Sequence, residues 1–398
     1  MRKILILIAL LSASVAAFSQ ETSQFFLAES THYRVYSESS QSEADSLSRM
    51  MEACLQLYND VFHFDLSTLA VKPRVRMFRS AASFNAHLTK ILSQTRSDFV
   101  YVSYSDPEKS ELLCFPKGEG DFTASLIHQG CVQYFKTFIA NPPIWLREGI
   151  ATYLEAALYN AQSGTFQLKP NFAWLDWLKK TLRKESGATL IPLAELRNLS
   201  REAAQTRLDA FFPQAWGLVE FLMNSSYKEY NRVLWDAISS LDPKATLEEN
   251  SLRVDKRAFE WVIDAQLSDD FEDHILSLMT APDLLRDGIE RYTKGELKEA
   301  EGSLRAALEL KPDNATVYYY LGLIAYARKD YPAAEDQYLI SFQLGMNTGL
   351  INYAMGVNAF AAGKNDVASK YLLFAKQADS AAYGEKVDSL LKRIGSAK

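Results

Sequence analysis

The chain has 398 residues, of which 49 are acidic and 43 are basic, so its formal net charge at pH 7 is −6. Hydrophobic residues make up 48% of the sequence, which is enough for a large core and excludes a disordered or low-complexity protein. The negative net charge disfavours nucleic-acid binding, because it offers no basic surface for phosphates. At roughly 100–200 residues per domain, we expect two or three domains.

Residues 1–19 have the features of a secretory signal peptide. Arg2 and Lys3 form a positively charged start, Ile4 to Leu11 is an unbroken apolar run, and small residues lead to a cleavage point before Gln20. The apolar run is too short to span a bilayer, and no later segment approaches the length of a transmembrane helix. We therefore expect an exported protein, periplasmic, envelope-associated or secreted, without a membrane span after signal removal.

Residues 30–160 alternate between strand and helix patterns, and residues 160–280 predict helices with no strand among them. The fold expected for this part is an α+β domain with a helical second lobe. The predicted strands cover residues 32–38, 73–80, 98–105 and 111–116. The predicted helices cover 41–60, 81–92 (with Ser80 as N-cap), 122–139, a segment that begins near Ile144, 174–182, 211–223, 230–241 and 254–264, and residues 190–199 predict a loop followed by a short helix.

Three cysteines are too few for a disulfide framework in a chain of this length. Cys54 and Cys131 lie on apolar helix stripes, so we expect them to be buried as small hydrophobic residues. Oxidation of one pair of cysteines remains an open alternative, and would leave an odd thiol.

One stretch carries chemistry-bearing residues at a meaningful spacing. Leu126 to Phe135 reads LIHQGCVQYF, and Pro143 to Glu155 reads PIWLREGIATYLE after a Pro-Pro break. A helix with H-E-x-x-H places two imidazoles on one face to bind zinc, with the Glu as general base. A following helix often supplies a Glu as third ligand.

The second segment resembles the corresponding helix of gluzincin metallopeptidases, especially the peptidase MA-like group. Residues 212–222 look like a later core helix of that group, and the resemblance covers roughly residues 30–265. It implies a zincin-like fold for residues 20–280. His128 then takes the first zinc-ligand position and Glu148 the third.

The resemblance fails at the other two functional positions. Gln129 stands where the general base should be, and Val132 stands where the second His should be. A neutral amide cannot take a proton from water, and valine has no lone pair for a metal. We therefore expect no catalytic residue and no cofactor. His128 would then be either a neutral histidine satisfied by one hydrogen bond or the partner of Glu148 in a buried remnant ion pair.

The alternative is an unconventional zinc peptidase that uses His128 and Glu148 with a rearranged third ligand. Gln133 lies about 100° around the helix from His128, and amides are poor zinc ligands. Other residues are suitable by type, but nothing in the sequence places them near His128: His63, His87 and Glu155.

The remainder of the chain contains an internal repeat with a period of 34 residues. Small residues recur at this spacing, where two helices would have to touch, and turns fall at the same interval. The recurring glycines are Gly288, Gly322 and Gly356, and the recurring alanines are Ala300, Ala334 and Ala368. This pattern is identified as the tetratricopeptide family, with three repeats over residues 281–382 and a capping helix over residues 383–398.

The first helix of each repeat is expected to line the concave face of an all-α tetratricopeptide superhelix. This face would be apolar and aromatic, either holding a protein or peptide segment or packing on the preceding domain. Its nine positions are Leu285, Ile289, Tyr292, Tyr319, Leu323, Tyr326, Tyr353, Val357 and Phe360. We call these nine residues the apolar face. The sequence thus predicts an exported binding or scaffold protein, unless the first domain only supports the repeats.

Overall fold

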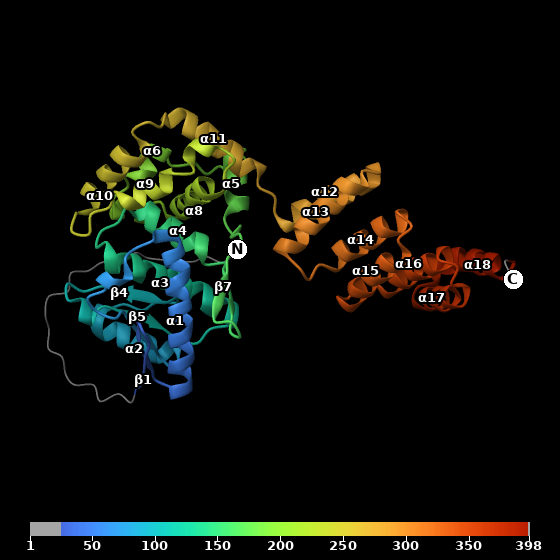
Figure 1. The fold of residues 1–398 in the computed structure, drawn as a ribbon, viewed down its shortest axis with the longest axis horizontal. Helices are drawn as coiled ribbons and strands as arrows, with labels where there is room; N and C mark the ends of the chain where they lie inside the picture. The colour runs from blue at the N-terminus through green and yellow to red at the C-terminus, as the bar shows by residue number, and fades with distance from the viewer. Residues whose placement is uncertain (1–24, 397–398) are drawn as a thin grey trace. The chain divides into compact units, whose positions relative to one another are not determined.

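The computed structural model describes residues 25–396, so the signal peptide expected over residues 1–19 lies outside the described residues. The chain divides into two compact units, one ending at Ser277 and the other beginning at Leu278. The sequence predicts this boundary three residues later, between residues 280 and 281. Each unit is described here by itself (Figure 1).

A five-stranded mixed sheet organises the first part of the N-terminal unit, with the strand order β1-β2-β3-β5-β4. The inner strands β2, β3 and β5 are parallel, and the edge strands β1 and β4 pair antiparallel. Val35, Val75 and Leu112 are in register across the inner strands and are fully buried. The strands are β1 Phe26–Glu29, β2 Arg34–Ser37, β3 Arg74–Met77, β4 Val100–Val102 and β5 Glu111–Cys114.

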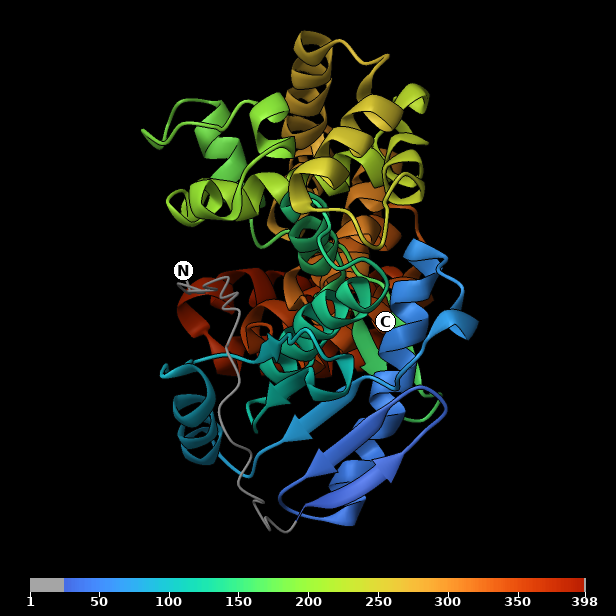
Figure 2. The same ribbon diagram turned by 90° about the vertical axis from the view of Figure 1, so that its left-hand side faces the viewer.

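The helices of this part follow the predicted order: α1 Gln41–Phe62, α2 Ala81–Leu92, α3 Glu119–Phe138 and α4 Ile144–Leu154. α1 and α3 contact one another and the strands of the sheet (Figure 2). Ser80 caps α2 as expected, and Ser83 completes a capping box. Strand β1 was not predicted, because Phe26 and Leu27 are exposed and the alternating pattern is weak.

The second part of the N-terminal unit is mainly helical, and these helices gather at one end of the unit (Figure 1). The expectation that no strand occurs after residue 160 is wrong, because β6 and β7 form a short, largely exposed hairpin. The elements of this second part are β6 Leu158–Asn160, β7 Thr165–Gln167, α5 Leu175–Leu182, α6 Leu193–Arg197, α7 Arg201–Gln205, α8 Leu208–Asn224, α9 Val233–Ser239, α10 Leu247–Val254 and α11 Asp264–Ser277.

The helix predicted over residues 254–264 is also wrong. α10 ends at Val254 and continues into a π-helical turn, Asp255–Phe259, and the next regular helix starts only at Asp264. This turn buries Ala258 and Phe259, and these buried apolar residues gave the sequence the pattern of an amphipathic helix. α11 was not predicted, because most of its residues are polar. Its buried apolar residues Leu267, Phe271 and Ile275 are nevertheless spaced by four residues, as on one face of a helix.

The C-terminal unit consists of three helix pairs and a last helix. Its helices are α12 Ala281–Lys294, α13 Leu297–Leu310, α14 Ala315–Ala327, α15 Tyr331–Gln343, α16 Thr348–Ala361, α17 Asn365–Ala378 and α18 Ser380–Ser396. The 34-residue period is confirmed, because each pair meets at the same small residues. A Cβ on Gly288 would lie 2.7 Å from Leu304 Cγ, and one on Gly356 would lie 2.7 Å from Leu372 Cγ. Val387 and Ile394 of α18 join the core of the last pair.

All three cysteines are buried and free, so the described chain has no disulfide among them. Burial raises the pKa of the Cys54 thiol to about 12 and raises that of the Cys131 thiol. Both thiols are therefore protonated and unreactive at neutral pH.

Gly149 of α4 sets the closest approach between the two parts of the N-terminal unit. A Cβ at this position would overlap the backbone carbonyl of Ala215 in α8. We expect Gly149→Ala to lower the free energy of unfolding of this unit by about 1–3 kcal/mol, because a backbone atom cannot move aside easily. All six tryptophans lie in this unit, so tryptophan fluorescence during urea unfolding measures the change.

The matched control is Gly120→Ala, near the start of α3, where a new Cβ meets nothing within 4 Å. Because alanine favours helix more than glycine does, this control should be neutral or slightly stabilising. Equal unfolding midpoints for the two variants would contradict the close approach.

Candidate functional site

His128 and Glu148 meet between α3 and α4, which is one of the two arrangements that the sequence left open for His128. Both side chains are almost fully buried, and His128 Nε2 lies 3.2 Å from Glu148 Oε2. The other ring nitrogen, Nδ1, lies 3.0 Å from Glu155 Oε2. The imidazole is therefore held between two carboxylates, one on each side of the ring.

Sequence reasoning missed the position of Glu155. Glu155 follows Glu148 by seven residues, which is two helical turns and therefore the same face of α4. That spacing was a usable signal. Asn171 fixes the second carboxylate by donating from Nδ2 to Glu155 Oε1 at 3.2 Å.

The charges of this buried group balance each other. Burial alone lowers the pKa of His128, but the hydrogen bonds and charges of Glu148 and Glu155 raise it to about 10. Burial likewise raises the pKa of Glu148, but Arg147 and His128 lower it to about 2. Arg147 donates from Nε to Glu148 Oε1 at 2.8 Å. At neutral pH the site therefore contains an imidazolium and a guanidinium around ionised Glu148.

Gln129 and Val132 are the two positions at which the resemblance to gluzincins fails. Gln129 Oε1 accepts a hydrogen bond from the Tyr101 N–H at 3.2 Å and so fastens edge strand β4 to α3. Val132 is half-buried. Gln133, the neighbouring amide, donates from Nε2 to the carbonyl oxygen of Arg74 at 2.9 Å, whereas its buried Oε1 has no partner among the described residues.

The residues around His128 do not fit a zinc ion. A metal-binding imidazole must offer a lone pair to the ion, whereas both nitrogens of His128 already face carboxylates, one on each side of the ring. Arg147 occupies the second oxygen of Glu148 and adds a positive charge there. Among residues 25–396 no group of three His, Cys, Asp or Glu side chains has a geometry that could hold a metal ion.

The nine residues of the apolar face are all half-buried. Seven of them pack against buried clusters between the repeat helices: Leu285, Tyr292, Tyr319, Leu323, Tyr326, Tyr353 and Phe360. In the described chain only Ile289 and Val357 belong to none of these clusters. These two positions are therefore the ones whose substitution tests the surface with least damage to the core.

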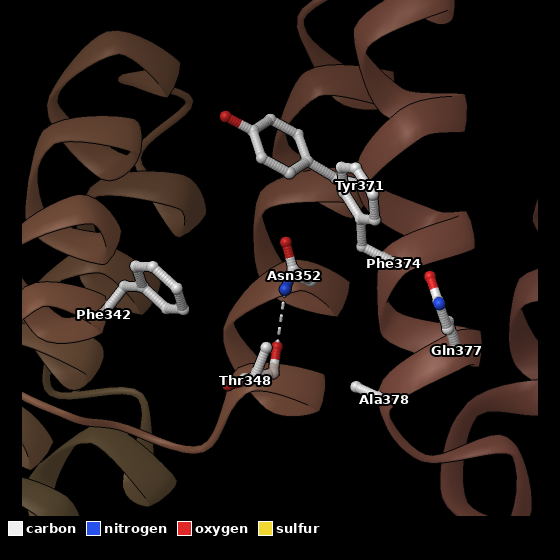
Figure 3. Close-up of a pocket in the computed structure, with 7 residues that line it drawn as sticks. All are labelled: Phe342, Thr348, Asn352, Tyr371, Phe374, Gln377 and Ala378. Carbon is white, nitrogen blue, oxygen red and sulfur yellow. Dashed lines mark hydrogen bonds between the residues drawn. The ribbon is translucent and has the colours of Figure 1, made fainter.

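The C-terminal unit also has a cavity of about 420 Å³ that the sequence did not predict. It contains none of the nine apolar-face residues and lies between α15, α16 and α17, where Phe342 faces Thr348 and Asn352 (Figure 3). Asn352 Nδ2 donates to the carbonyl oxygen of Thr348 at 2.8 Å. Phe342 and Phe374 are 44% and 55% exposed, so the rim is apolar. The residues that line it are Phe342, Thr348, Asn352, Tyr371, Phe374, Gln377 and Ala378.

Comparison with known proteins places the repeats in a family. Residues 285–341 match the tetratricopeptide repeat family. No curated protein is detectably similar to the chain. Among solved structures, the first tetratricopeptide domain of Spaghetti (RPAP3), bound to the HSP90 peptide SRMEEVD, is 18% identical over 30% of this chain and 92% of that one. Its TM-score of 0.28 is too low to show a shared arrangement.

No helix of the described residues has the length and hydrophobicity needed to cross a bilayer.

The buried charge group predicts a pH dependence of stability. His128 has a pKa of about 10 in the folded chain, above the ordinary value of 6.5, so the stability it confers is complete below pH 6.5 and is lost as the pH rises through 10. We expect His128→Gln to cost about 3–5 kcal/mol at pH 6, because it leaves two carboxylates without their cation. The difference from the wild type should shrink between pH 6.5 and 10 in urea unfolding.

The exposed His63 has a left-handed backbone conformation that asparagine also adopts, so His63→Asn is the control. Its difference from the wild type should not vary in the same way. A constant difference between His128→Gln and the wild type across this pH range would contradict a charged His128.

Proposed function

Starting from a C-terminal unit of tetratricopeptide repeats, we propose that this protein is an exported scaffold that binds a protein or peptide. In this proposal the repeats are the interaction module, and the N-terminal unit is a metallopeptidase-like domain that has lost its catalytic site. The family match over residues 285–341 carries the proposal, because stacked helix pairs of this kind present an extended surface to a partner.

The chemistry of the apolar face favours an uncharged partner segment. Its nine positions contain five aromatic and four aliphatic side chains, and no charged residue. An apolar surface of this kind buries apolar side chains of a ligand and offers no positive charge for a terminal carboxylate. The occupant would therefore be a segment with apolar or aromatic side chains.

The state of His128 supports the loss of catalysis in the N-terminal unit. Gln129 cannot act as a general base, and its amide oxygen is used to fasten β4. Glu148 is bound by both His128 and Arg147 and is unavailable as a ligand. We propose that the pair His128–Glu148 contributes to stability alone and that the protein needs no cofactor.

The alternative proposal is a zinc peptidase that uses His128 and Glu148 with a rearranged third ligand. Glu155 is a suitable third ligand by residue type and lies close to His128. It contacts ring nitrogen Nδ1, however, whereas Glu148 contacts Nε2. One metal ion cannot bind on both sides of the same ring, so this pair of carboxylates would have to rearrange.

Zinc stoichiometry separates the two proposals. We expect the mature protein, residues 20–398, to retain less than about a tenth of an equivalent of zinc after dialysis against trace metal, because a two-ligand site binds weakly. Elemental mass spectrometry measures the bound metal. One zinc per chain that is lost in His128→Ala would favour the peptidase and would sink the pseudoenzyme proposal.

Peptide selection tests the proposed binding face. Peptides selected from a displayed random library on the full mature chain should be rich in apolar and aromatic residues. We expect Ile289→Asp and Val357→Asp each to raise the Kd of the selected peptides by at least roughly tenfold, which is about 1.4 kcal/mol of binding free energy. The reason is that a carboxylate would be buried against apolar side chains. Fluorescence anisotropy with a labelled peptide measures the affinity.

The matched control is Leu373→Asp, at a 53% exposed position of α17 that is not part of the apolar face. It introduces the same charge into the same unit and should leave affinity unchanged. Equal losses in all three variants, or selected peptides dominated by acidic residues, would contradict the proposed face.

A further inference from the structure

The cavity of about 420 Å³ in the C-terminal unit has no role in the proposed function, because none of the apolar-face residues lines it. α16 contacts both α15 and α17, and so forms the floor of the cavity between them. Phe342 and Phe374 stand on its two sides (Figure 3) and are 44% and 55% exposed, so the cavity is open to solvent. Its volume falls within the range of about 300–1,000 Å³ that is usual for ligand sites.

The 34-residue period identifies the equivalent positions in the preceding repeat. The helices of the two repeats begin at equivalent positions to within one residue, so equivalent side chains leave their helices in the same direction. Asn352 on the floor is equivalent to Tyr318 of α14, and Ala378 at the end of α17 is equivalent to Leu344. At both positions the cavity thus has a small side chain where the preceding repeat has a large one.

The side walls of the cavity differ from the preceding repeat in the opposite sense. Three wall positions carry aromatic rings where the preceding repeat has aliphatic or amide side chains. Aromatic rings favour edge-to-face or offset contacts with another ring. A smaller floor between larger aromatic walls is therefore suited to a ring that enters from another molecule. The replacements are Phe342 for Leu308, Tyr371 for Gln337 and Phe374 for Ile340.

Asn352 adds a hydrogen-bond acceptor to the floor. Its Nδ2 donates to the carbonyl oxygen of Thr348 at 2.8 Å, which fixes the orientation of the amide. Oδ1 is turned away from Thr348 (Figure 3), and none of the described residues donates a hydrogen bond to it. All seven residues that line the cavity are uncharged, so an ionised ligand group would find no counter-charge there.

We propose that this cavity binds the side chain of a tyrosine from a protein partner. The phenol ring would lie between Phe342 and Phe374, in the space that corresponds to Tyr318 in the preceding repeat. Its hydroxyl would donate to Asn352 Oδ1. The uncharged lining matches a neutral ring, and the equivalence with Tyr318 argues for a ring of this size. The site is separate from the apolar face and does not depend on the proposed function.

Binding of blocked amino acids to the full mature chain tests the site. We expect N-acetyltyrosinamide to bind with a Kd on the order of 1 mM, because so small a ligand buries little surface. N-acetylphenylalaninamide should bind roughly threefold to tenfold more weakly, since it lacks the hydroxyl and one hydrogen bond is lost. N-acetylleucinamide offers no ring to the walls and should bind more weakly still. Ligand-observed saturation-transfer NMR measures the three affinities.

Asn352→Tyr locates the effect. It supplies the ring that Tyr318 supplies in the preceding repeat, so it should fill the cavity and abolish binding of N-acetyltyrosinamide. Circular dichroism during heating should show that this variant is at least as stable as the wild type. The matched control, Val367→Tyr, adds the same ring at a 37% exposed position two helical turns before Phe374 and outside the cavity, and should bind as the wild type does. Ile289→Asp, on the apolar face, should also leave this binding unchanged.

The proposal would be overturned by an absence of saturable binding to the wild type, or by equal binding to the wild type and Asn352→Tyr. Equal affinities for the tyrosine and phenylalanine amides would overturn the role of Asn352 Oδ1, and with it the assignment to tyrosine. Sedimentation of the wild type should show a monomer. A dimer that Asn352→Tyr dissociates would overturn the assignment to a partner protein, because the occupant would then be a second copy of this chain.

Discussion

The N-terminal unit depends on the pairing of charges that are almost fully removed from water. Arg147, Glu148 and His128 are each no more than 3% exposed, and unpaired charges at such positions would be prohibitive. Because His128 belongs to α3, while Glu148 lies on α4 and Glu155 caps its C-terminal end, the group fixes the register of one helix against the other. The same helices connect the sheet to the helical part, through the tight contact of Gly149 with α8.

This pairing also explains how two carboxylates share a buried site with an imidazole. The imidazole of His128 and the guanidinium of Arg147 supply the positive charge that the carboxylates need there. Single substitutions in a buried group of this kind are destabilising, because the loss of one member leaves the others without a partner.

The C-terminal unit is built on a different constraint, the close approach of paired helices. Glycine and alanine at the contact points allow a large residue of the second helix to fill the gap, which is Leu304, Tyr338 or Leu372 in successive repeats. Some aromatic side chains of the first helices contact other aromatic rings on neighbouring helices. Tyr292 and Tyr320 pack edge to face, and Tyr353 of α16 stacks on Tyr383 of α18. The proposed partner would meet a surface that is already held rigid by these contacts.

The sequence by itself determined the features that depend on local or periodic patterns. These features are the helix over residues 81–92 with its Ser80 cap, the inner strands of the sheet and the 34-residue repeat. Each follows from the spacing of apolar, capping or small residues within one segment or one repeat. The sequence also offered the pairing of His128 in α3 with Glu148 in α4, as one of two alternatives for His128.

Only the tertiary structure decided the features in which distant segments compete for the same atoms. It placed Glu155 on the second nitrogen of His128, committed Gln129 to β4, and turned residues 255–259 into a π-helical turn. No local pattern encodes such encounters, because their energies come from burial and from charges that meet only when the chain has folded.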